Sequence, residues 1–296
     1  MKYFKYKNNN LYCEELKVAD ICNIFETPFY LYSYNAIINN FNKLSSMLKG
    51  ANTVIAYSVK ANSNLSILKI LAGMGSGADI VSSGELNRAL LAKIPNDKIV
   101  YSGVGKTYKE ISAALESKIL QFNVESLEEL KKISEIAVQK KLTANIALRV
   151  NPDISAGGHP KISTGKKTDK FGVSIIKSKE IYQLAKTLKG IRIVGVDIHI
   201  GSQILNIKPF KTAFNKIIKF TKELEADGHE IKNIDLGGGV GINYLNSKES
   251  DIFLKNYTDL IKYVSKKTNK KIIIEPGRYL LGNTGILVTK VLYKKT

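Results

Sequence analysis

The chain has 296 residues, which is enough for one large domain or two small ones. Its apolar content of 44% can supply a buried core and excludes a disordered chain. The net charge of +19 would suit a nucleic-acid binder, but only four of the 45 basic residues are arginines and the lysines are scattered, so we expect no nucleic-acid partner.

The sequence contains neither a recognisable targeting segment nor a cysteine pattern that would indicate disulfides or a metal site. No apolar run reaches the length of a membrane span, and residues 1–10 lack the apolar segment of a secretory signal. We therefore expect a cytoplasmic protein without a membrane partner. Cys13 and Cys22 give neither a disulfide framework nor metal-ligand spacing, so no metal is expected.

The first elements in chain order are short. Residues 1–25 could hold a strand or two, and residues 27–32 read as the entry to a strand. Apolar residues at helical spacing predict a helix over residues 35–48, with Ser33 or Asn35 as its N-cap.

A regular alternation of strands and helices follows. The predicted strands are 53–58, 78–81, 98–101, 120–124, 145–150, 193–199, 233–236 and 271–274, and the helices between them are 64–72, 84–92, 108–116, 127–139, 178–188, 209–226 and 252–266. Eight strands with seven helices between them predict an α/β fold with a closed (β/α)₈ (TIM) barrel. An open doubly wound sheet is the alternative, but the first strand is not followed by a dinucleotide or P-loop fingerprint.

The two ends of the chain indicate a second, incomplete unit. A strand is predicted over residues 286–293, and the N-terminal residues could supply its pairing partner. We expect residues 1–27 to form the N-terminal part of a β-domain, residues 28–282 the barrel, and residues 283–296 the start of the C-terminal part.

Lys60 stands directly after the first buried barrel strand, where an ammonium group is costly to desolvate. It could simply extend into solvent. A desolvated lysine, however, loses its proton more readily and can form a Schiff base with a carbonyl.

Other polar residues occur at or just beyond strand ends, where the active sites of such barrels lie. They are Asp79, His199 with Ser202, the run Gly237–Gly239, and Glu275 with Gly277 and Arg278. Each has a structural alternative: His199 as a core residue, Asp79 as a helix cap, Glu275 as an ion-pair partner and the glycines as a plain loop.

Taken together, these residues offer an imine-forming lysine, a flat ring, an acid and a glycine-rich phosphate cradle with an arginine nearby. Pyridoxal 5′-phosphate (PLP) requires such a set. The sequence therefore predicts a PLP site at this end of the barrel.

Four motifs carry a resemblance to a known family, the alanine-racemase-like, PLP-dependent amino-acid decarboxylases. They are Tyr57–Asn62, Asp197–Gln203, Asp235–Gly239 and Glu275–Tyr279. The long loop, with the segments Arg149–Asp153, Ala156–Gly165 and Asp169–Gly172, is most similar to that of the diaminopimelate decarboxylases. Ornithine and arginine decarboxylases share the first motifs but usually differ in this loop.

The resemblance implies decarboxylation of meso-2,6-diaminopimelate to L-lysine and CO₂, the last step of lysine synthesis, by a homodimer. It implies that Lys60 holds PLP, that His199 stacks on its ring and that Glu275 faces the ring nitrogen. Ser202, Gly239, Gly277 and Arg278 would bind the phosphate, and Arg278 would also contact the amino-acid substrate. Asp79 and Gly238 are further candidates for the cofactor site.

The sequence departs from the family at its C-terminal end. Family members continue through a segment that completes the β-domain and supplies a cysteine acid, substrate-binding residues and dimer contacts. We therefore expect a truncated relative. The alternatives are an ornithine- or arginine-type decarboxylase, a non-catalytic PLP-binding relative, and a barrel enzyme for another phosphorylated ligand.

Overall fold

Eight parallel strands close into a barrel in the computed structural model, which describes residues 3–155, 171–244 and 247–295. The barrel strands are β5 (Thr53–Ser58), β6 (Gly77–Ile80), β7 (Ile99–Tyr101), β8 (Gln121–Val124), β9 (Ala144–Asn151), β11 (Ile191–Asp197), β12 (Asn233–Asp235) and β13 (Lys271–Ile274). They pair in this order, and β13 pairs with β5 to complete the circle. The predicted (β/α)₈ barrel is confirmed.

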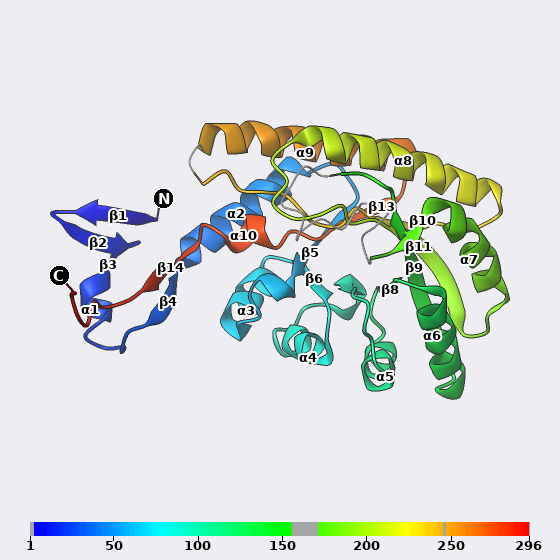
Figure 1. The fold of residues 1–296 in the computed structure, drawn as a ribbon, viewed down its shortest axis with the longest axis horizontal. Helices are drawn as coiled ribbons and strands as arrows, with labels where there is room; N and C mark the ends of the chain where they lie inside the picture. The colour runs from blue at the N-terminus through cyan, green and yellow to red at the C-terminus, as the bar shows by residue number, and fades with distance from the viewer. Residues whose placement is uncertain (1–2, 156–170, 245–246, 296) are drawn as a thin grey trace.

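Helices follow the strands and form the outer layer (Figure 1). They are α3 (Leu65–Gly73), α4 (Ser83–Leu91), α5 (Tyr108–Glu116), α6 (Leu127–Gln139), α7 (Ile175–Thr187), α8 (Ile207–Ala226), α9 (Ser247–Thr268) and the single-turn α10 (Arg278–Leu281). Helix α2 (Tyr34–Met47) precedes the barrel and packs against α3, α9 and α10, so it fills the remaining place in the ring. None of the helices in the described part of the chain is long and apolar enough to cross a membrane.

Short polar side chains fix where several helices begin. Ser33, Ser82, Thr107 and Ser126 each accept a hydrogen bond from a backbone N–H in the first turn of the helix that follows. This arrangement satisfies donors that have no partner inside the helix. The prediction of Ser33 as the cap of α2 is confirmed, and the cap of α4 is Ser82 rather than Asp79.

The two chain ends form small antiparallel sheets beside the barrel (Figure 1). One contains β1 (Phe4–Lys7), β2 (Asn10–Cys13) and β3 (Leu16–Lys17), which leads into the single-turn α1 (Val18–Ile21); the other pairs β4 (Phe29–Tyr32) with β14 (Gly285–Val288). Apolar side chains from both sheets pack together in one cluster.

The C-terminal strand is shorter than predicted. The prediction placed it at residues 286–293, but β14 ends at Val288 because its partner β4 offers only four residues for pairing. Val291 and Tyr293 beyond it are exposed.

The inside of the barrel and its outer shell differ in polarity. The shell between strands and helices is a continuous apolar core. Inside the barrel, the small apolar cluster Ala56, Val100 and Ile273 is separate from that core, and the buried polar residues Asn123 and Glu275 hydrogen-bond to each other across the barrel. Polar groups inside a barrel need hydrogen-bond partners, which the facing strands supply.

Packing between α8 and α9 rests on aromatic residues, and this gives a first prediction. Phe214 is 0% exposed and its ring lies 6.3 Å from that of Tyr257 and 5.7 Å from that of Phe210. We expect Phe214→Ala to lower the free energy of unfolding by about 3–5 kcal/mol through lost burial and an unfilled cavity. Urea denaturation measures this loss, with the exposed Ile252→Ala in α9 as the control that stays near wild type. Equal losses in both variants would contradict the packing described.

Candidate active site

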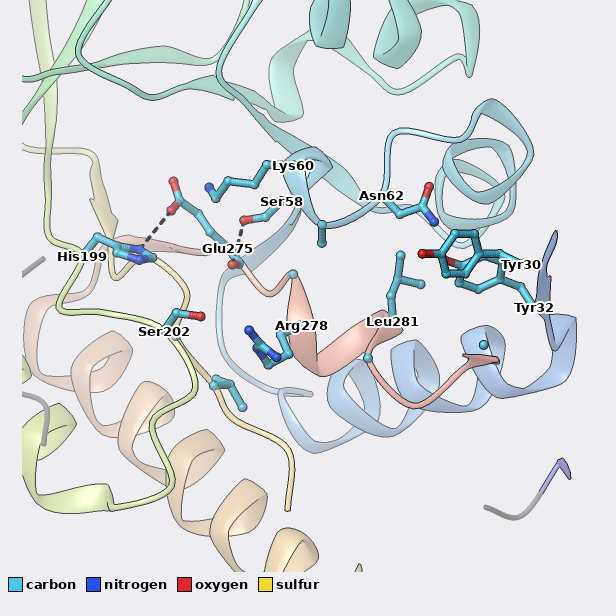
Figure 2. A pocket seen from close by; sticks show the side chains of 16 residues that line it. Tyr30, Tyr32, Ser58, Lys60, Asn62, His199, Ser202, Glu275, Arg278 and Leu281 are labelled. Atoms are coloured by element: carbon cyan, nitrogen blue, oxygen red, sulfur yellow. Dashed lines mark hydrogen bonds and ion pairs between the residues drawn. The ribbon is translucent and has the colours of Figure 1, made fainter. Parts of the chain in front are cut away.

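A cavity of about 550 Å³ opens at the C-terminal ends of the barrel strands (Figure 2). Seven of the residues predicted from the sequence line it: Lys60, His199, Ser202, Gly239, Glu275, Gly277 and Arg278. Asp79 lies behind Lys60, and Gly238 lies behind His199, so the structure brings the whole predicted set together.

Lys60 forms an ion pair with a buried acid. Its side chain is 48% exposed because it lines the open cavity, while its Nζ donates to Oδ2 of the fully buried Asp79 at 2.6 Å. Burial alone lowers the pKa of Lys60, but the charges of Asp79 and Glu275 more than offset this, and the pKa lies above its ordinary value. The expectation of a lysine whose pKa is lowered overall is therefore wrong for the ligand-free chain, although desolvation acts in the expected direction.

Asp79 holds the lysine from the neighbouring strand. It belongs to β6, and the same Oδ2 atom accepts a second hydrogen bond, from Ser58 Oγ on β5 at 2.8 Å. Its other oxygen, Oδ1, is buried without a hydrogen-bond partner among the described residues. Asp79 thus fixes where the Lys60 amine lies and leaves one carboxylate oxygen unused.

His199 follows β11 and lies beside Glu275 (Figure 2). The N–H of Gly238 donates to His199 Nδ1 at 3.1 Å, which assigns the proton of the neutral imidazole to Nε2. Burial lowers the pKa of His199 below its ordinary value in spite of the nearby Glu275. The ring is therefore neutral at pH 7, and Nδ1 lies 3.7 Å from Glu275 Oε2.

Glu275 is buried at the end of β13 with acidic neighbours on both sides. Carboxylate oxygens of Asp197, Asp235 and Glu275 lie within 4.8 Å of one another. Burial raises the pKa of Asp197 and Asp235 well above their ordinary values, and the charge of Glu275 raises them further. Burial would also raise the pKa of Glu275, but the positive charges of Lys60 and Arg149 hold it below its ordinary value. The negative charge of the cluster therefore lies on Glu275.

The glycine run after β12 does more than line a loop. The N–H of Gly237 donates to Asp235 Oδ1 at 3.0 Å, and that of Gly238 donates to His199. A Cβ atom on Gly238 would overlap the carbonyl oxygen of Glu275, so only glycine fits. Of the three N–H groups expected to face an anion, only that of Gly239 has no acceptor in the described part of the chain.

A second buried ion pair stands beside the site. Arg149 Nη1, at the end of β9, donates to Glu125 Oε1 at 2.6 Å, and the N–H of Gly172 donates to the other oxygen of Glu125. The Arg149 guanidinium also lies 4.9 Å from the centre of the Phe171 ring. These contacts tie the end of the predicted long loop to the barrel; its motif residues 156–165, 169 and 170 lie outside the described residues.

Several residues of the site were not predicted. Tyr30 and Tyr32 of β4 line the cavity although they precede the barrel, and no motif identified them. Asn123 donates to Glu275 from inside the barrel. The alternation Gln121-Phe122-Asn123-Val124 on a fully buried strand was the available signal, because it places two polar side chains on one buried face.

The residues present fit PLP. One cavity brings together an amine, the neutral ring of His199, the anionic Glu275 and, from Gly239, a backbone donor without an acceptor among the described residues. Figure 2 shows the Arg278 side chain extending into the same cavity from the start of α10, with Ser202 drawn nearby. These groups correspond to the aldehyde, ring, ring nitrogen and phosphate of PLP.

The Lys60–Asp79 pair predicts a pH effect. Asp79→Asn removes the charge that raises the Lys60 pKa, so the pKa falls and the free amine appears at lower pH. We expect the pH midpoint for acetylation of Lys60 by acetic anhydride, followed by peptide mass mapping, to move to lower pH in Asp79→Asn. In the unchanged chain, the ion pair contributes its full stabilisation of the fold at pH values below the ordinary lysine pKa of about 10.4. This contribution is lost as the pH rises through the raised pKa of Lys60.

The matched control is Glu116→Gln, which removes the carboxylate partner of Lys140 in an exposed ion pair. Lys60 acetylation in that variant should follow the wild-type curve. A Lys60 midpoint unchanged or raised in Asp79→Asn would show that Asp79 does not keep this lysine protonated.

Comparison with known proteins agrees with this site. Residues 34–282 match the family model described as "Pyridoxal-dependent decarboxylase, pyridoxal binding domain". The chain is 43% identical to a diaminopimelate decarboxylase of Haemophilus influenzae over 100% of its own length and 71% of the relative, and 43% identical to one of Aquifex aeolicus over 99% and 69%.

A solved structure gives the same result. The crystal structure of diaminopimelate decarboxylase from Helicobacter pylori complexed with L-lysine is 42% identical and superposes with a TM-score of 0.89, covering 94% of this chain and 70% of that one. The barrel fold, the family match over residues 34–282 and the identities above 40% all indicate the same family. The chain therefore belongs to the pyridoxal-dependent decarboxylase family, among the relatives of the diaminopimelate decarboxylases.

Proposed function

We propose that this chain is a PLP-dependent carboxy-lyase that converts meso-2,6-diaminopimelate to L-lysine and CO₂, the last step of lysine biosynthesis. The observation that carries the proposal is the cavity in which Lys60 Nζ, held by Asp79, lies with His199 and the anionic Glu275. Relatives at about 40% identity named diaminopimelate decarboxylase support the choice of substrate over ornithine or arginine.

Lys60 is the group that would hold the cofactor. Its ion pair with Asp79 keeps the amine at the end of β5 and protonated in the ligand-free chain. An amine must lose its proton before it attacks a carbonyl, so Lys60 must give up the proton that Asp79 favours before it can hold the cofactor.

His199 and Glu275 would hold the ring. When bound, PLP supplies an electron-accepting ring that stabilises the charge left on the substrate carbon as CO₂ departs. Glu275 keeps a negative charge where the ring nitrogen would lie, which favours a proton on that nitrogen. His199 offers a neutral face, fixed in orientation by the N–H of Gly238.

The phosphate would lie in the part of the cavity lined by Ser202, Gly239, Gly277 and Arg278. The backbone N–H of Gly239 has no acceptor in the described part of the chain, and a guanidinium suits a phosphate or carboxylate. We further propose that Arg278 contacts a substrate carboxylate. Gly238 acts through His199, since its own N–H is already used.

The overall reaction exchanges one group on one carbon. The bond between the α-carbon and its carboxylate carbon breaks, its electron pair stays on the α-carbon, and a proton takes the place of the lost CO₂. Three expectations stay predictions: the division into residues 1–27, 28–282 and 283–296, the homodimer, and the cytoplasmic location.

A product assay tests the substrate. The chain is supplied with PLP and with meso-diaminopimelate, ornithine or arginine, and amino-acid products are quantified together with released CO₂. We expect L-lysine from meso-diaminopimelate alone. Lys60→Ala should reduce it to background, because among the described residues Lys60 is the lysine that lines the cavity.

Two results would contradict the proposal. Preferential turnover of ornithine or arginine would show that the substrate is wrong, and equal turnover by Lys60→Ala would show that the site is wrong. The control that keeps wild-type turnover is Lys132→Ala, because this exposed lysine pairs with Glu135 on the helix surface.

A further inference from the structure

Asn123 lies inside the barrel, directly below the cofactor pocket. It is fully buried on β8, and its Nδ2 atom lies 3.3 Å from Glu275 Oε1 and 3.0 Å from Asp235 Oδ2. A further acceptor, Ser102 Oγ, is 3.2 Å away. One amide group therefore contacts the acid of the pocket and an acid of the layer beneath it.

The oxygen of this amide accepts from a chain of two other amides. Asn233 Nδ2 donates to Gln121 Oε1 at 2.9 Å, and Gln121 Nε2 donates to Asn123 Oδ1 at 2.8 Å. An amide oxygen can only accept and an amide nitrogen can only donate. The three amides therefore form one consistent donor-to-acceptor series, in which the NH₂ group of Asn123 faces the acids.

The two oxygens of Glu275 have different surroundings. Oε1 accepts hydrogen bonds from Asn123 and from Ser102 Oγ, each at 3.3 Å, on the inner side. Oε2 is the atom nearest to His199 Nδ1, on the side of the pocket. The hydrogen bonds that Oε1 accepts thus fix the direction in which Oε2 points toward the pocket.

We propose that Asn123 is a positioning residue for Glu275, which holds this side chain as an anion from inside the barrel and directs its second oxygen into the pocket. The inference rests on the proposed function, which gives Glu275 its task at the cofactor ring. Asn123 is not among the residues that line the cavity and acts through Glu275.

Charged groups from several elements surround Glu275, and the neutral amide has a distinct place among them. Lys60 after β5 and Arg149 on β9 favour its charged form, and the neutral His199 after β11 lies beside it. Three acids, Asp79 on β6, Asp197 on β11 and Asp235 on β12, lie around it. Asn123 contributes donors without adding a charge, and a hydrogen bond to the charged form of a carboxylate favours that form.

The test is the titration of Glu275 in the ligand-free chain. Protein labelled with ¹³C at the glutamate side-chain carboxyl is titrated by NMR, and Glu275→Gln assigns the Glu275 signal. In Asn123→Leu, which keeps the side chain's approximate size but has no donor, the pKa of Glu275 should rise by about one to two units.

The matched control is Asn145→Leu, because Asn145 lies in the adjacent strand β9 and its amide donates to the backbone of Leu120 instead. It should leave the Glu275 titration unchanged. If Asn123→Leu does not fold, Asn123→Asp keeps the shape and replaces the NH₂ by oxygen. The introduced carboxyl and Glu275 should then bind their first proton at higher pH than Glu275 does in wild type.

A folded Asn123→Leu or Asn123→Asp in which Glu275 titrates as in wild type would overturn the proposal and leave Asn123 with a purely structural role. The titration needs neither PLP nor substrate. A chain that fails to turn over diaminopimelate but shows the shift would therefore contradict the proposed function alone.

Discussion

A carboxylate must stay charged inside a protein barrel, and the rest of the site depends on this condition. An isolated carboxyl as buried as that of Glu275 would take up a proton. Lys60 and Arg149 supply positive charge from two sides, and Asn123 with Ser102 supplies hydrogen bonds from below. The neighbouring Asp197 and Asp235 have raised pKa values, so the acids do not compete for charge. The barrel interior is polar at this level because it serves the pocket above.

The Lys60 amine and the Glu275 carboxylate are brought together by closure of the barrel. Lys60 follows the first barrel strand and Glu275 the last, and the two strands are neighbours only because β13 pairs with β5. Ser58 reinforces this seam, since its backbone N–H donates to the carbonyl oxygen of Pro276. Gly238 then passes so close to the Glu275 backbone that no side chain fits. A barrel that failed to close would separate the amine from the acid.

Sequence reasoning predicted the barrel, most element positions and the principal site residues, because strand–helix alternation and polar residues at strand ends are local patterns. It could not predict what depends on contacts across the barrel. The raised pKa of Lys60 follows from its distance to Asp79, and the use of the Gly238 N–H follows from the place of His199. Tyr30 reaches the cavity only through the pairing of β4 with β14, and the length of that pairing also set the end of the last strand.

The most direct test of the account is borohydride reduction of the purified chain after incubation with PLP, followed by peptide mass mapping. The central claim is that the barrel holds one amine, that of Lys60, in a built cofactor site. The account predicts a pyridoxyl adduct on Lys60 and on no other lysine. An unmodified Lys60, or adducts scattered over surface lysines, would contradict it.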